Sequence, residues 1–267
     1  MKTFYIIGNP IEHSLSPKLF LHIFNRLDIK ARYLPYMPLN DNTLITFLKN
    51  NIDNFSGANI TLPFKINAFN LVHSNDMSSK NIKSVNCIKN VNNKLIGYNT
   101  DSYAFNKMIN NIDLNLDNHS ILVLGNGGTS RTVVHSLLNR TKNKIFIWGR
   151  NKKRVDSFIE EINSNQIKYF NQNFNKPLVV INCLSLNIDE NSIQTILSYI
   201  PINSVELFID LNYCETQFSK KLIGKKCNVI LGLDMFIFQA LKSFDIWFDN
   251  QYHNKISFQE VKALLNK

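Results

Sequence analysis

The segment ILVLGNGGTSRTVVHSLL, residues 121–138, decides the fold of the second half of the chain. Its first four residues are apolar and predict a buried strand, and its last ten place apolar residues at helical spacing. Glycine between the two permits a tight turn and lets backbone N–H groups approach a pyrophosphate at a helix N-terminus. A second apolar run, Ile145–Trp148, completes a strand–helix–strand unit of about thirty residues. The candidate cofactor-binding residues of this loop are Gly125, Asn126, Gly127, Gly128 and Thr129.

Glycine is scarce in the rest of the chain, which supports the interpretation of residues 125–129 as a cofactor-binding loop. The 267 residues include nine glycines, where average usage of about 7% would give about 19. Three of the nine lie within residues 125–128, so the backbone there needs glycine. The alternative is a plain turn, and Ser130 departs from the Gly or Ala expected at the third fingerprint position.

The residues after the second strand indicate which cofactor binds. An NAD site places Asp or Glu there to accept hydrogen bonds from the ribose 2′-hydroxyl. Residues 149–154 read GRNKKR and contain no carboxylate. Because guanidinium groups bind phosphate through two parallel hydrogen bonds, this segment favours NADP over NAD. The candidate 2′-phosphate residues are Arg150, Asn151 and Arg154, and the alternative is a solvated helix start.

Helix and strand patterns alternate along the whole chain, which predicts two α/β domains. The first is a substrate domain over residues 1–101, and the second is a Rossmann-like, doubly wound domain over residues 102–234. From Met235 to Lys267 the pattern is helical, and we expect these helices to return to the first domain. Expected strands and helices of the first domain lie at 3–7, 17–27, 33–34, 41–51, 55–61, 64–72, 84–89 and 94–98.

Composition excludes several classes of protein. With 44% hydrophobic and 19% charged residues the chain can form a buried core, and no stretch is long and apolar enough for a membrane helix. The N-terminal residues lack a signal-peptide layout, and the four cysteines form no Cys-x-x-Cys pair. These features predict a cytoplasmic protein. The net charge of +10 invites nucleic acid, but the basic residues are spread among acidic ones, so we expect no nucleic-acid partner.

Three segments of the first domain carry groups suited to a small polar substrate. Ser14 and Ser16 place two hydroxyls where they can reach one carboxylate, although Ser16 is equally suited to cap the helix that follows. Lys65 follows a strand and a proline turn, where it can serve in acid–base chemistry or simply be exposed on a helix. Asp101 lies just before the second domain, where its carboxylate can face a cleft between the domains or simply cap a helix.

In their order along the chain, these segments resemble those of the shikimate dehydrogenase family. The matching motifs are Ser14-x-Ser16-Pro17, Asn59-x-Thr61-x-Pro63-x-Lys65, Ser84-Val85-Asn86, Gly97-x-Asn99-Thr100-Asp101, Gly125-x-Gly127-Gly128-x-x-Arg131, Gly149-Arg150-Asn151, Asp210-x-x-Tyr213 and Gly232-Leu233-Asp234-Met235 through Gln239. The resemblance spans nearly the whole chain. It implies reversible, NADP-dependent reduction of 3-dehydroshikimate to shikimate.

The resemblance also implies residue roles. Lys65 and Asp101 are the expected catalytic pair, and metal is not expected. Substrate-binding residues are expected to be Ser14, Ser16, Thr61, Asn86, Tyr213 and Gln239. Gly232 and Met235 are expected to join the cofactor site. The expected partner is the small-molecule substrate, with no membrane and with a monomer or homodimer as the assembly.

The nearest alternative is a quinate/shikimate dehydrogenase with relaxed substrate or cofactor choice. More distant alternatives are a basic nucleic-acid-binding protein and a regulator that binds NADPH without turnover. Three departures from the family pattern stand out. Cys87 and Leu184 each replace a usual threonine, and the loop 213–217 is shortened and lacks a proline after its threonine.

Overall fold

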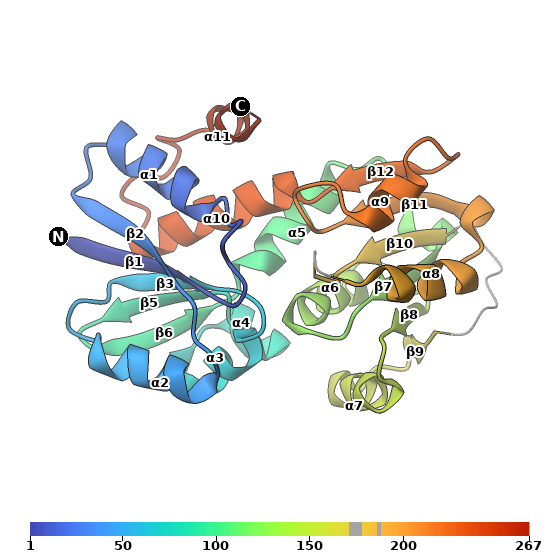
Figure 1. Cartoon of the computed structure of the whole chain (residues 1–267), viewed down its shortest axis with the longest axis horizontal. Helices are drawn as coiled ribbons and strands as arrows, with labels where there is room; N and C mark the ends of the chain where they lie inside the picture. The colour runs from blue at the N-terminus through green and yellow to red at the C-terminus, as the bar shows by residue number, and fades with distance from the viewer. Residues whose placement is uncertain (171–177, 186–187, 267) are drawn as a thin grey trace. The chain divides into compact units, whose positions relative to one another are not determined.

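The structure, a computed structural model, describes residues 1–170, 178–185 and 188–266. It divides into two compact units, one formed by Met1–Ala104 with Ile237–Lys267 and the other by Phe105–Phe236 (Figure 1). The divisions fall inside two helices, α5 (Thr100–Asn110) and α10 (Leu233–Trp247). Each unit is built on a six-stranded sheet, so the prediction of two α/β domains is confirmed.

The first sheet has the strand order β2-β1-β3-β5-β6-β4. Its central strands β1 and β3 are parallel, whereas β5 runs antiparallel to both of its neighbours. As a result β1, β3 and β6 end at one edge of the sheet, and β5 begins there. The strands and helices are β1 (Lys2–Ile7), α1 (Ser16–Arg26), β2 (Ala31–Tyr36), α2 (Asp41–Asn50), β3 (Gly57–Ile60), α3 (Lys65–Leu71), β4 (Ser74–Asn75), α4 (Met77–Ile82), β5 (Cys87–Val91) and β6 (Lys94–Tyr98).

Alternation along β1 sends side chains to two helical layers. Phe4 stacks on Trp247 of α10, with 4.6 Å between ring centroids, and Phe24 of α1 lies on the same face. On the other face Tyr5 packs edge-on against Phe47 of α2. Helices α1 and α10 therefore cover one face of the sheet, and α2 and α3 cover the other (Figure 1). The expected return of the C-terminal helices to the first domain is confirmed.

The second sheet has the strand order β12-β11-β10-β7-β8-β9, and all its neighbouring strands are parallel. This is the doubly wound Rossmann order, with the first and fourth strands of the unit, β7 and β10, side by side at its centre. The elements are η1 (Leu116–Asn118), β7 (Ser120–Leu124), α6 (Gly128–Leu138), β8 (Ile145–Trp148), α7 (Lys152–Ile162), β9 (Ile167–Tyr169), β10 (Leu178–Asn182), α8 (Glu190–Tyr199), η2 (Ile202–Ser204), β11 (Val205–Asp210), α9 (Gln217–Leu222) and β12 (Asn228–Leu231).

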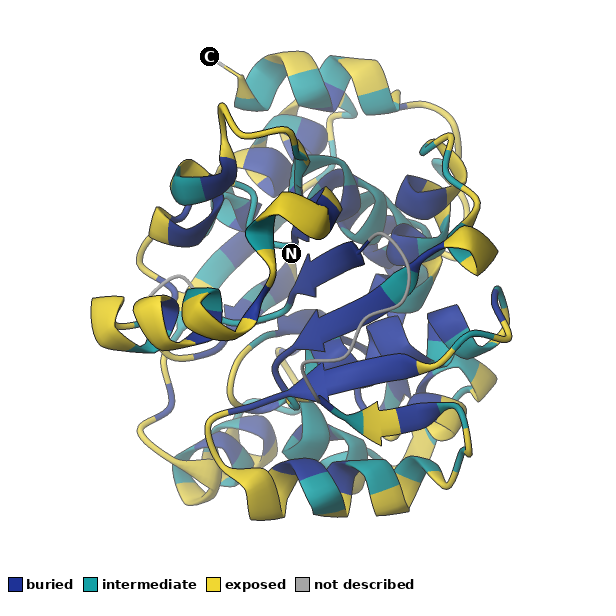
Figure 2. Cartoon of the chain, turned by 90° about the vertical axis from the view of Figure 1, so that its right-hand side faces the viewer, coloured by how far each residue is buried: buried dark blue, intermediate teal, exposed yellow. Residues whose placement is uncertain are grey.

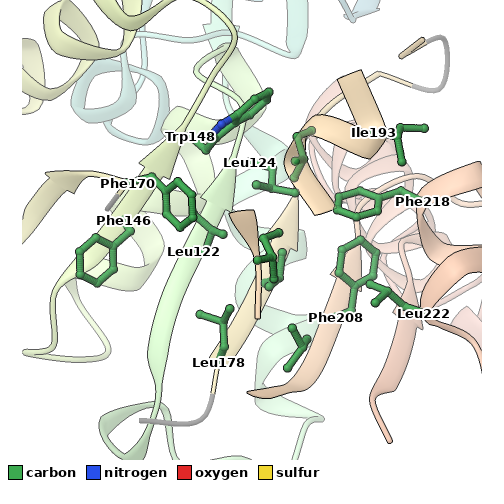
Figure 3. Packing of buried hydrophobic residues seen from close by; sticks show 14 residues of the cluster. Leu122, Leu124, Phe146, Trp148, Phe170, Leu178, Ile193, Phe208, Phe218 and Leu222 are labelled. Carbon is green, nitrogen blue, oxygen red and sulfur yellow. The ribbon is translucent and has the colours of Figure 1, made fainter. Parts of the chain in front are cut away.

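The central strands of this sheet are buried along almost their entire length (Figure 2). Continuous apolar runs are expected for parallel strands, because helices cover both faces. On one face, Ile193 of α8 and Phe218 of α9 pack with Leu124 and Phe208 from the strands (Figure 3). This packing fixes the carboxyl ends of β7 and β10, where the glycine loop begins.

The expected C-terminal helices are α10, which ends at Trp247, and α11 (Phe258–Leu265), but the helical pattern does not hold for residues 248–257 between them. Asp249 and Asn250 adopt φ of 51° and 60° between them, a conformation that a continuing α-helix cannot contain. The patterns also missed the short elements β4, α4, β9 and α9, and strand β5 begins at Cys87 rather than residue 84.

In the part of the chain that the structure describes, every helix is too short or too polar to cross a membrane.

Candidate active site

The candidate catalytic residues of the first unit gather at the edge where three strands end. Ser14 and Ser16 follow β1, Lys65 follows β3, Asp101 follows β6, and Asn86 directly precedes β5. Residues far apart in the sequence thus meet because their strands share one sheet.

Lys65 and Asp101 form a largely buried ion pair. The Lys65 Nζ lies 2.7 Å from Oδ2 of Asp101, and the two side chains are 14% and 8% exposed. Lys65 is the first residue of α3, and it is not an exposed helix residue. Asp101 does not cap α5 either, because the Asn99 side-chain oxygen accepts the Ser102 N–H at 3.0 Å.

The Asn86 amide joins this pair and fixes its second carboxylate oxygen. Its Nδ2 donates to Oδ1 of Asp101 at 2.8 Å and to Oγ1 of Thr100 at 2.9 Å. Its Oδ1 accepts the Thr100 backbone N–H at 2.6 Å. Both carboxylate oxygens of Asp101 are therefore hydrogen-bonded, and Asn86 has one fixed orientation.

The turn before Lys65 is set by a close approach of two strand ends. The Thr61 backbone N–H donates to the Ile7 carbonyl at 2.8 Å, and Thr61 lies next to Gly8. A Cβ at Gly8 would lie 2.2 Å from the Thr61 methyl group, so only glycine allows this contact. Thr61 is half-buried and lies four residues before Lys65, and its role in substrate binding stays a prediction.

The two serines of the predicted carboxylate loop are placed differently from each other. Ser14 is half-buried, and its Oγ accepts the Ser16 N–H at 3.3 Å. Ser16 is 3% exposed and does not cap α1, so that expectation was wrong. The helix begins one residue earlier than expected, at Ser16 itself, and the nearby Tyr33 phenol donates to Oδ1 of Asn59 at 2.9 Å. Burial raises the pKa of Tyr33, so the phenol stays protonated as a donor.

The remaining predicted substrate residues lie in different units. Gln239 lies on α10 in the first unit and is half-buried. Tyr213 belongs to the second unit, where its ring packs on Phe236 with 5.0 Å between centroids.

The glycine loop of the second unit has room for a bound phosphate group. Gly125 has φ of 108°, which favours glycine, and its N–H donates to the Trp148 carbonyl at 2.7 Å. Gly127 is the N-cap of α6, and among the described residues no side chain makes a capping hydrogen bond there. A Cβ at Gly127 would meet no described atom within 4 Å, so this part of the structure leaves space beside it. The N-terminus of an 11-residue helix with glycine at its N-cap suits a pyrophosphate. Asn126 and Thr129, both half-buried, flank this helix end.

The predicted 2′-phosphate residues lie at the end of β8. Arg150 is 72% exposed and approaches Asp189 of the α8 N-terminus at 3.9 Å. Asn151 caps α7 by accepting the Arg154 N–H at 3.2 Å, so its side-chain oxygen has a structural role. Arg154 is exposed. Among the described residues of this turn, four cations (Arg150, Lys152, Lys153 and Arg154) outnumber two nearby carboxylates (Asp189 and Asp156), and the donor set fits a phosphate.

Close packing also determines the late motifs of the second unit. A Cβ at Gly232 would lie 2.3 Å from the Leu211 carbonyl oxygen, so glycine is required there. Met235 is 5% exposed, which leaves little of its side chain accessible to a cofactor.

Asp210 anchors the shortened loop that carries Tyr213. Its carboxylate accepts from Thr216 Oγ1 at 2.6 Å, Asn212 Nδ2 at 2.8 Å and Asn182 Nδ2 at 3.1 Å. Burial is the largest influence on this carboxyl and raises its pKa, against the lowering effect of these donors. Thr216 also caps α9, so the missing proline is replaced by an ordinary helix start.

Residue patterns missed three members of the first-unit site: Thr100, Tyr33 and Ser243. Thr100 and Ser243 lie 3.1 Å apart through their hydroxyls. Ser243 lies four residues after Gln239 on the same helix, and no residue pattern singles it out. Across residues 1–170, 178–185 and 188–266, no three His, Cys, Asp or Glu side chains gather as a metal site would require.

Comparison with known proteins gives the same assignment along the chain. Residues 6–88 match the model for the shikimate dehydrogenase substrate binding domain, and residues 107–184 match that for shikimate / quinate 5-dehydrogenase. The chain is 32% identical to the shikimate dehydrogenase (NADP(+)) of Clostridium beijerinckii, covering 96% of each protein. It is 30% identical to that of Staphylococcus haemolyticus, covering 98% of this chain and 97% of the relative. The crystal structure of shikimate dehydrogenase from Aquifex aeolicus superposes with a TM-score of 0.82 at 25% identity, over 100% of this chain and 98% of that one.

Proposed function

The chain belongs to the shikimate dehydrogenase family, and from this premise we propose how its own residues perform the family's reaction. The reaction is the reversible, NADP-dependent reduction of 3-dehydroshikimate to shikimate. The observation that carries the assignment of catalytic residues is the shielded ion pair of Lys65 and Asp101, 2.7 Å apart.

Lys65 is the proton donor in the direction of reduction. When bound, the cofactor supplies the hydride that the substrate carbon receives. As that carbon is reduced, the Lys65 ammonium gives one proton to the substrate oxygen, which becomes the hydroxyl group of shikimate. In the direction of oxidation the Lys65 amine takes the same proton back.

Asp101 holds the Lys65 side chain at the reacting oxygen. Its Oδ2 is bound to Lys65, and its Oδ1 is bound to the Asn86 amide at 2.8 Å. This fixed geometry supports catalysis, because proton transfer requires donor and acceptor within hydrogen-bond distance. We assign the substrate carboxylate to Ser14 and Ser16.

The remaining polar side chains would bind the ring hydroxyls and the cofactor. Substrate hydroxyls are assigned to Thr61, Asn86, Gln239 and Tyr213. The pyrophosphate is assigned to residues 125–129, the 2′-phosphate to Arg150, Asn151 and Arg154, and further cofactor contacts to Gly232 and Met235. Gly127 supports this assignment, because the described residues leave space beside it.

We further propose that the enzyme works in the cytoplasm, as a monomer or homodimer and without a nucleic-acid partner. The mixed distribution of Lys and Arg with Asp and Glu supports the last point. A salt titration of binding to random DNA tests it, because a phosphate-tracking surface would lose affinity steeply with salt.

Absorbance of the reduced nicotinamide tests the function directly. Shikimate and quinate are each supplied with NADP and with NAD, and initial rates are compared. We expect turnover with shikimate and NADP to exceed every other combination. Comparable rates with quinate, or with NAD, would favour the relaxed quinate/shikimate enzyme instead, and NADPH binding without any turnover would indicate a regulator.

A further inference from the structure

A chain of buried hydroxyl and amide groups extends from the catalytic pair to α10. The Asn86 amide donates to Oγ1 of Thr100 at 2.9 Å, and the Thr100 hydroxyl lies 3.1 Å from the Ser243 hydroxyl. Ser243 in turn donates to the backbone carbonyl of Gln239 at 2.8 Å. Thr100 and Ser243 are 1% and 0% exposed, so water does not replace these bonds.

A second branch joins Ser243 to Tyr33 of β2. The Asn59 amide nitrogen donates to Ser243 Oγ at 2.9 Å, and its oxygen accepts from the Tyr33 phenol at 2.9 Å. Asn59 and Tyr33 are 4% and 8% exposed. Ser243 is therefore the point where the branch from Tyr33 meets the branch from Asp101.

The proton count fixes the direction of each bond at this point. A serine hydroxyl has one proton and two lone pairs. Ser243 gives its proton to Gln239, so its oxygen accepts from Asn59 and from Thr100. The Cys87 thiol also contacts Ser243, but a thiol is a weak hydrogen-bonding group and does not change this count. The Thr100 hydroxyl, which accepts from Asn86, is thereby committed to donate to Ser243.

Loss of the Ser243 oxygen would redirect the Thr100 proton toward Asn86. The nearest alternative acceptor for that proton is Oδ1 of Asn86, at 3.3 Å. This oxygen already accepts the Thr100 backbone N–H at 2.6 Å. The Asn86 amide would then turn, and its bond to Oδ1 of Asp101 would weaken.

We propose that Ser243 is a positioning residue for the Lys65–Asp101 pair, acting through Thr100 and Asn86. Through Asn59 it also joins the buried Tyr33 phenol to the same network. Ser243 touches neither the substrate nor the reacting atoms in this assignment. The expected effect on kcat rests on the proposed function. The expected effect on stability rests on the hydrogen bonds alone.

The catalytic test compares Ser243→Ala with Ser79→Ala at saturating shikimate and NADP. Ser79 is a matched control, because it is also 0% exposed, lies in the same unit on α4, and donates to the Gly97 carbonyl at 2.9 Å. We expect Ser243→Ala to lower kcat by about 10- to 100-fold, since small misplacements of reacting groups have effects of that size. KM for shikimate should change by less than about threefold, because the substrate-binding side chains remain. Ser79→Ala should lower the unfolding temperature but keep kcat within about twofold. A Ser243→Ala enzyme with kcat within twofold of the wild type would overturn the positioning role.

The stability test uses no substrate and probes the same series of hydrogen bonds from Tyr33. Tyr33→Phe removes only the phenol oxygen that bonds to Asn59. Because Tyr33 and Ser243 both hold Asn59, the unfolding-midpoint shift in urea of the double variant with Ser243→Ala should be smaller than the sum of the single shifts. Strictly additive shifts would show that Asn59 does not couple Tyr33 to Ser243, and would overturn the proposed hydrogen-bond network. An inactive wild type would refute the proposed function while this coupling could still be measured.

Discussion

Replacement of Arg150 by alanine should remove most of the preference for NADP. Arg150 follows β8 in the Rossmann-like unit, at the turn expected to lie beside the adenosine ribose. Its side chain is 72% exposed, so each hydrogen bond to a phosphate is taken at the low end for a charged group, about 1.5 kcal/mol or roughly tenfold. Two such bonds from one guanidinium give roughly a 100-fold preference.

Asp189 reduces this preference, because it lies 3.9 Å from Arg150 in the protein without cofactor. A 2′-phosphate must share or displace this carboxylate. Since exposed ion pairs contribute little, Asp189→Asn should raise kcat/KM for NADP by no more than about fivefold.

The assay is kcat/KM with NADP and with NAD for the wild type, Arg150→Ala and Asp189→Asn. We expect at least about a 100-fold preference for NADP in the wild type, and a preference below about tenfold in Arg150→Ala, through loss of NADP efficiency alone. Arg26→Ala serves as control, because Arg26 is similarly exposed but lies on α1 in the other unit. An equal loss with both cofactors would refute the reasoning, since NAD lacks the 2′-phosphate.

Three further outcomes are expected. Ser14→Ala and Ser16→Ala should each raise KM for shikimate by about tenfold or more, because each removes a hydrogen bond to a charged group; wild-type KM in both variants would reduce the loop to a structural role. The folded pKa of Asp210 is raised above its ordinary value of 3.8, so its contribution to stability is full below that pH and is lost as pH rises through the folded pKa. The unfolding temperature of Asp210→Asn should lack this decline as the pH rises above 3.8, whereas a pH profile identical to that of the wild type would show that Asp210 does not cause it. Burial raises the pKa of Cys87 to about 12. Iodoacetamide should therefore modify exposed Cys214 and leave Cys87 intact in the folded protein, as peptide mass mapping would show. Rapid labelling of Cys87 would contradict its burial.

Local sequence patterns were sufficient for the glycine loop and the elements beside it, although they missed β9 and α9 of the same unit. The strand ending at Leu124, the loop from Gly125 and the helix that follows are encoded in consecutive residues, and their hydrophobic periods differ clearly. The charged turn after Trp148 is likewise local. Short polar elements such as β4 and α4 gave no such signal, because two to six residues cannot establish a period.

The first-unit site depended on contacts between distant residues. Lys65 and Asp101 are 36 positions apart, and only the resemblance to a family suggested that they meet. Ser243 lies 184 positions from Asn59, on a helix whose pattern indicates only packing. Ser16 followed by Pro17 is typical of a helix cap, but α1 begins at Ser16 itself, and the Ser16 side chain is buried against the rest of the unit. Tertiary partners decided these cases, and no local pattern contains them.

The kcat of Lys65→Ala, at saturating shikimate and NADP, tests the central claim most directly. Lys80→Ala, an exposed lysine of the same unit, is the control. If Lys65 exchanges the proton with the substrate oxygen while Asp101 holds it in place, kcat should fall by about 10²- to 10⁴-fold, with a much smaller change in KM for shikimate. A Lys65→Ala enzyme that keeps more than about half of the wild-type kcat would contradict the assignment of this pair as the catalytic groups.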